Sequence, residues 1–306
     1  LTIGSLEVLR DNAGQTLVPA MLGRNSAGLE RANGQLWAVE RGANTLLGPA
    51  VGALLVGIGL ASPLFVQSWA FVIAGLFAMR ISASVGTAHI RPGTTAEESW
   101  RVALRAGISH LWRQRLLRTI ALSLGGLNLA GWIGSGTYIL FAQEVMGVGP
   151  VLFAVVGFGG AIGGVVGGFA APRISDRIGS GPSLALATGG LTAVALTIAI
   201  APVWPVVMAA SVFEFFFITL WSIVTLSFRQ AVVPAALFGR VNAAHRFIGW
   251  GAIPIGAFIS GVLVTLVSNV ASREVALRSV WVVAAATYAC VFATTITRIT
   301  SQRMDS

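Results

Sequence analysis

Lysine is absent from this sequence, cysteine occurs once, and charged residues of either sign are scarce. All basic residues other than histidine are arginines, which is typical of a GC-rich bacterial genome, and the lone Cys290 excludes an intrachain disulfide. Without lysine there is no Walker-type phosphate loop, and neither an HExxH nor a GxSxG motif is present. We therefore expect no enzymatic activity, no bound metal and no cofactor.

Hydrophobic residues make up 55% of the 306 residues, and charged residues only 10%. A soluble domain carries about 25% charged residues, so this composition excludes a soluble protein. Apolar runs of about 20 residues, the length of a bilayer-spanning helix, recur along the chain and are too long for the strands of a membrane barrel. The sequence predicts an all-α membrane protein with full spans at residues 36–60, 64–81, 116–143, 150–172, 183–201, 203–228, 244–268 and 279–297.

The arginines predict how these spans are oriented. Nearly all of them fall in alternate loops and at the chain ends, and only Arg273 and Arg278 fall on the opposite side. The positive-inside rule therefore places both chain ends, including the C-terminus, in the cytoplasm. This distribution also explains the net charge of +9, so we expect lipid and not nucleic acid as the surroundings of the chain.

One long loop separates two parts of the chain. Residues 82–114 contain "EESWRVALRAGISHLW", in which apolar residues recur at helical spacing. This pattern predicts an amphipathic helix lying along the cytoplasmic membrane surface. The loop divides residues 1–81, an N-terminal bundle, from residues 115–306, a C-terminal six-helix bundle.

The two parts share a repeated motif. "VPAMLGR" at the start of the chain is matched by "VPAALFGR", and Arg31-Ala-Asn33 is matched by Arg240-Val-Asn242. Arg41 has a counterpart in Arg246. Such periodicity is typical of a duplicated membrane bundle with parallel repeats.

On these segments the sequence resembles the major facilitator superfamily, and within it the branch of enterobactin exporters and macrolide efflux proteins. The likeness covers essentially the whole chain and places residue 1 inside the fourth of twelve helices, so that the N-terminal half is incomplete. It implies a monomeric exporter in the bacterial plasma membrane. The exporter would move a small amphipathic or hydrophobic compound, drug-like or siderophore-like, in exchange for protons. The alternative is a non-transporting membrane scaffold or sensor, or a decayed transporter fragment.

A second likeness concerns the glycines and proline of the first span. "GANTLLGPAVGALL" resembles the antiporter signature of the fifth helix, with Gly48, Pro49 and Gly52 in place and Ala53 where a second glycine is usual. Gly42, Gly48 and Gly52 fall nearly on one face and predict a close approach by a neighbouring helix. The segment is either this signature or simply a packing face.

A third likeness concerns gating. "PRISDRIG" resembles the cytoplasmic loop motif between helices 8 and 9, carried by Asp176, Arg177 and Gly179. The resemblance implies that these residues, with Arg240 and Arg246 of the matching repeat, lock and release the cytoplasmic side.

Ionisable residues within the spans are costly in lipid and mark functional sites. Glu214, in "SVFEFFFITLW", is flanked by phenylalanines that would exclude water, and it is either a proton-coupling or substrate residue or a structural carboxylate. Glu40 and Arg41 belong either to a gating charge network, with partners expected among Glu7, Arg10 and Asp11, or to the substrate site. Asn128 either lines the cavity or joins two helices.

The predicted span at residues 150–172 carries glycines at every fourth residue in two columns. This spacing predicts a two-column close-packing surface. The columns are Gly160, Gly164 and Gly168, and Gly159, Gly163 and Gly167.

Overall fold

The computed structural model describes residues 15, 18–19, 21–23, 25–59, 61–85 and 100–299, and every regular element in these ranges is a helix. Six helices are long and apolar enough to cross a membrane, which confirms six of the predicted spans. They are α6 (Arg115–Ser135, continued by α7, Tyr138–Leu140, and the π-helix η3, Phe141–Val145), α8 (Pro150–Ile178), α9 (Ser180–Ile200), α10 (Trp204–Val232), α11 (Ala235–Ser268) and α12 (Arg273–Arg298).

Several helices run further than their apolar segments. α8 continues to Ile178, so the motif expected in a loop is the last turn of a helix, and only Gly179, with φ of 85°, turns the chain. α11 begins directly after Pro234, so Arg240, which precedes the predicted span at 244–268, is helical and not in a loop. Hydropathy reveals only the segment within lipid, whereas the helix continues through polar residues beyond it.

The segment predicted as a span at residues 36–60 is helical up to Ile58 but changes helix type along its length. That segment consists of the end of α2 (Ser26–Arg41), the π-helix η1 (Gly42–Leu47) and α3 (Gly48–Ile58). Pro49 lacks the N–H that would bond the carbonyl of residue 45, and a proline or a π-bulge is the usual cause of such an irregularity. The predicted span at 64–81 lies in α4 (Ser62–Val85), which is apolar over Ser62–Phe77.

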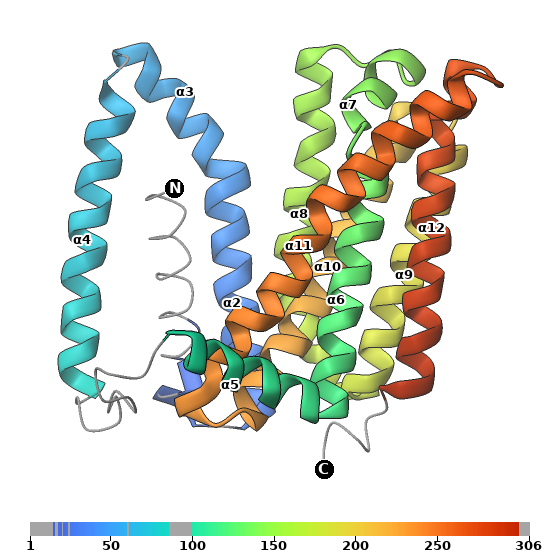
Figure 1. The fold of residues 1–306 in the computed structure, drawn as a ribbon. Helices are drawn as coiled ribbons and strands as arrows, with labels where there is room; N and C mark the ends of the chain where they lie inside the picture. The colour runs from blue at the N-terminus through green and yellow to red at the C-terminus, as the bar shows by residue number, and fades with distance from the viewer. Residues whose placement is uncertain are drawn as a thin grey trace.

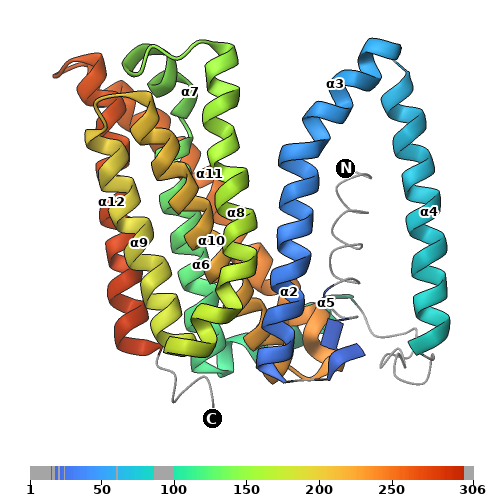
Figure 2. The same ribbon diagram turned by 180° about the vertical axis from the view of Figure 1, so that it is seen from behind.

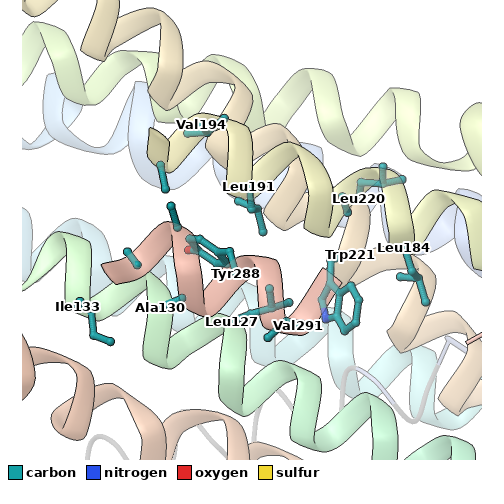
Figure 3. Close-up of a cluster of buried hydrophobic side chains, with 14 of the residues drawn as sticks. Leu127, Ala130, Ile133, Leu184, Leu191, Val194, Leu220, Trp221, Tyr288 and Val291 are labelled. Atoms are coloured by element: carbon teal, nitrogen blue, oxygen red, sulfur yellow. The ribbon is translucent and has the colours of Figure 1, made fainter. Parts of the chain in front are cut away.

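The core of the C-terminal bundle lies among α6, α9, α10 and α12. Figure 3 shows Leu127, Leu191, Trp221 and Tyr288 converging from these four helices. Each of these side chains is buried, and together they form one continuous apolar cluster. A fixed core of this kind lets the C-terminal bundle behave as one unit.

The predicted glycine columns of α8 are confirmed. A Cβ at Gly163 would overlap the carbonyl of Val212 in α10, so one column packs against α10. In the other column a Cβ at Gly168 would lie 2.7 Å from the carbonyl oxygen of Gly34 in α2. α8 is therefore held closely between α10 and α2.

α2 joins the N-terminal helices to the bundle at one end only. We call this the basic end, the end that holds Ser26, Arg113, Ile178 and Arg298. Figures 1 and 2 show α2 against α8 and α10 there, while α3 and α4 stand apart from the bundle toward the other end. The amphipathic helix predicted in the linker is α5 (Trp100–Arg113), which lies across the basic end.

Candidate functional site at the basic end

Charged and polar side chains join α2 to the end of α8. Arg31 Nη2 lies 3.2 Å from Asp176 Oδ2, and Ser175 Oγ donates to Glu30 Oε1 over 3.1 Å. Glu30 is only 4% exposed, so this second contact lies inside the α2–α8 interface. Asp176, expected in a gating motif, thus pairs across the two parts of the molecule.

A buried chain of amides continues the connection onto α10. Asn33 Nδ2 donates to Ser227 Oγ over 2.9 Å and to Gln230 Oε1 over 2.6 Å. Gln230 Nε2 in turn donates to the backbone carbonyl of Gln15 over 2.8 Å. Asn33 is 2% exposed, so these hydrogen bonds lie away from water. They orient α2 on α10.

The repeat partner of Asn33 completes this amide chain. Asn242 Nδ2 donates to Gln15 Oε1 over 3.0 Å, and Asn242 Oδ1 accepts from Arg229. Arg229 Nε also donates to the carbonyl of Thr225 over 3.2 Å. The two asparagines of the repeated Arg-x-Asn motif therefore both bind the end of α10. The sequence repeat predicts that Asn33 and Asn242 correspond. It carries no signal that both side chains contact α10.

The other residues of the predicted gating set have different surroundings. Arg177 is exposed at the end of α8. The backbone of Arg240 contacts α5, because a Cβ at Gly107 would lie 2.7 Å from the carbonyl group of Arg240. Arg246 places its guanidinium 4.1 Å from the ring centroid of Trp250. The basic end thus also contains the contact between α5 and α11.

Comparison with protein-family models and with curated proteins finds no match.

Arg41 lies where α2 passes into η1. Its Cζ atom is 5.6 Å from the ring centroid of Trp37 and 5.4 Å from that of Phe215 in α10. Glu40 beside it is exposed, and the partners expected at Glu7, Arg10 and Asp11 lie outside the described residues. Arg41 and Arg246 match in one respect, because each stacks on a tryptophan four residues away.

Glu214 lies part-buried in the first half of α10. Both tyrosines of the chain, Tyr138 and Tyr288, are within electrostatic interaction distance of its carboxyl group. Among residues 100–299 no arginine forms an ion pair with it.

Asn128 joins two helices. Its Nδ2 donates over 2.8 Å to the carbonyl of Gly249 in α11, so it fixes α6 to α11. Of the two roles expected for Asn128, this hydrogen bond supports the one that joins two helices.

The glycines of the antiporter-like motif have few described neighbours. A Cβ at Gly52 would meet no described atom within 4 Å, and one at Gly48 would meet only the carbonyl of Ala43 in the same segment. Of the three glycines predicted to face a neighbouring helix, only Gly42 does so among the described residues, since a Cβ there would lie 3.8 Å from Cγ2 of Val165 in α8. What the motif contributes is a change of helix type, since Gly48 and Pro49 begin α3 directly after η1.

The part of the chain that the structure describes holds no group of three or more His, Cys, Asp or Glu residues able to bind a metal. The site is thus built from arginine, amide and carboxyl groups.

Proposed function

We propose that the chain is a secondary transporter of the major facilitator type, a proton-coupled exporter of a small amphipathic or hydrophobic compound. The six span-length helices, the repeated Arg-x-Asn motif and the arginine-rich ends of the spans support this proposal. The arginine bias favours a cytoplasmic location for the basic end.

The observation that carries the proposal is the contact between the two parts of the molecule. α2 meets α8 and α10 through an ion pair and buried hydrogen bonds at the basic end, and α3 leaves the bundle beyond η1. Two bundles joined at one membrane face and separated toward the other are the arrangement that alternating access requires. The contact would open as the bundles rock and would expose the basic end.

Glu214 is the residue we propose for proton coupling. A carboxyl group within lipid favours its neutral form, and contact with water favours its charged form. A cavity that faces each side in turn would therefore load and release one proton in each cycle.

The test measures dye efflux from vesicles that contain the protein and carry an imposed pH gradient. Ethidium and fluorescein serve as a cationic and an anionic dye. Glu214→Gln keeps the shape of the side chain and removes its titration. Glu274→Gln, which changes an exposed carboxylate at the start of α12, is the matched control.

We expect the wild type and Glu274→Gln to move at least one dye in proportion to the gradient, and Glu214→Gln to lose the gradient dependence. Equal gradient dependence in Glu214→Gln would exclude Glu214 as the coupling residue. Absence of movement by correctly folded wild-type protein would overturn the export proposal for these dyes and favour a membrane scaffold.

A further inference from the structure

Arg41 is enclosed by three helices. Trp37 of α2 and Phe215 of α10 each present a ring within 6 Å of its guanidinium carbon. On the α8 side, a Cβ at Gly164 would lie 3.1 Å from Arg41 Cγ, so the stem of the arginine packs where α8 has no side chain. The side chain is thus held in place by packing and not free at a surface.

Packing against aromatic rings does not use the hydrogen-bonding capacity of the guanidinium. A guanidinium has five N–H donors in its plane, and aromatic rings interact with its faces and not with these donors. Within the described residues no hydrogen bond or ion pair reaches them, and the adjacent Glu40 points about 100° away around the helix. Arg41 falls in the segment predicted as a span at residues 36–60, and an arginine within a span costs about 2.5–3.5 kcal/mol on insertion scales, which favours a functional role.

The position of Arg41 along α2 suits a ligand site. It lies about 10 Å further along the helix than Gly34, at 1.5 Å per residue. At Gly34, α2 and α8 are in close contact, because a Cβ there would overlap the carbonyl oxygen of Gly168. Directly after Arg41 the helix becomes π-helical, a feature frequent at functional sites, and then leaves α8. Glu40 is exposed, so Arg41 is the first charged side chain of α2 beyond the contact at Gly34 that packs against α8 and α10.

We propose that Arg41, Trp37 and Phe215 form the recognition site for an amphipathic organic anion that carries an aromatic ring. The planar fork of the guanidinium would bind a carboxylate or sulfonate through two N–H groups. The two rings would stack on the aromatic part of the ligand. The proposal rests on the export function and names its substrate class.

Binding of a matched pair of fluorescent probes tests this site. Dansylglycine carries one carboxylate, and dansylglycinamide has the same ring without the charge. The full chain is reconstituted in phosphatidylcholine nanodiscs, and the dissociation constant of each probe is measured from dansyl fluorescence after subtraction of empty discs. The variants are Arg41→Gln, Arg41→Lys, Phe215→Leu and, as the control, Arg113→Gln at the exposed end of α5.

We expect the wild type to bind dansylglycine at least tenfold more tightly than dansylglycinamide. Arg41→Gln should bind both equally, Arg41→Lys should keep part of the preference, and Phe215→Leu should weaken both probes alike. Arg113→Gln should match the wild type, which excludes an effect of net charge.

Equal binding of the two probes by the wild type would overturn the proposal whether or not the variants fold. A preference that persists in folded Arg41→Gln would do the same and would leave Arg41 a structural residue. No pH gradient is used, so this result is independent of the efflux assay. A protein that discriminates the probes but moves no dye would retain the site and lose the export function.

Discussion

His245 lies in α11 one turn beyond Asn242, close to the buried amide chain. Its side chain is 2% exposed, and neither ring nitrogen has a hydrogen-bond partner in the described structure. The guanidinium of Arg229 is within electrostatic interaction distance. An unsatisfied buried polar group costs about 1–3 kcal/mol, so this imidazole destabilises the closed basic end.

Replacing His245 by leucine should therefore stabilise the protein. Leucine has nearly the same volume and removes the unsatisfied nitrogens, so we expect the free energy of unfolding to rise by about 1 kcal/mol. Reversible unfolding in mixed micelles measures this. His110→Leu, on the partly exposed α5, should change stability by less than about 0.5 kcal/mol. A less stable His245→Leu protein would show that the imidazole has a partner that stabilises it.

Residue partners were the least predictable part of the site. The motif points to Asp176, but its partner Arg31 lies 145 residues away and stands out in the sequence only as part of the repeat. No sequence pattern points to Gln230 or Ser227, since isolated amides and hydroxyls in a polar helix end carry no signal of their own. The packing of α2 on α10 makes these two side chains the hydrogen-bond partners of Asn33.

At the scale of helices, α8 decides how closely the parts approach. Its glycines let α10 and α2 pack backbone to backbone, and the four-residue spacing predicted close packing but not these two partner helices. Helix ends were predicted less well. α11 begins nine residues before the predicted 244, because hydropathy falls where the helix leaves lipid while its hydrogen bonding continues.

A methyl group at Gly168 should separate α2 from α8. Its Cβ would lie 2.7 Å from the carbonyl oxygen of Gly34 and 2.8 Å from the Cβ of Ala38, so one helix must move. We expect Gly168→Ala to lower the free energy of unfolding by about 1–3 kcal/mol. Gly157→Ala in the same helix, where no described atom lies within 4 Å, should be neutral. Equal effects of both substitutions in micelle unfolding would show that the α2–α8 contact does not form.

For the whole molecule, the central question is how easily the contact at the basic end opens. Arg31 and Asp176 are 69% and 39% exposed, and an exposed ion pair contributes about 0.2–1 kcal/mol. The buried bonds of Asn33 and Glu30 add to this. Interactions of this strength can be overcome by a modest change in charge. The proposed alternation between two states requires a contact that can open in this way.

Composition and apolar run length predicted the membrane class and six spans, because the bilayer sets a length that any sequence must match. The arrangement of the two parts was not predictable in the same way. It depends on where α2 stops following α8, and that point is set by the π-helix at Gly42–Leu47, whose sequence has no distinctive periodicity.

Distances between spin labels test alternating access most directly. With Cys290 replaced by serine, one pair of labels is placed at Ser26 and Ile178 on the basic end, and a second at Ile58 and Val155 toward the opposite end. Each pair is measured in the wild type, in Asp176→Arg and in the charge-swapped Arg31→Asp/Asp176→Arg protein.

We predict one short Ser26–Ile178 distance in the wild type. In Asp176→Arg this distance should gain a longer population while the Ile58–Val155 distance gains a shorter one, and the charge swap should restore the wild-type pattern. Two distances that do not change in opposite directions would contradict alternating access, because the two parts would then not rock about the contact at the basic end.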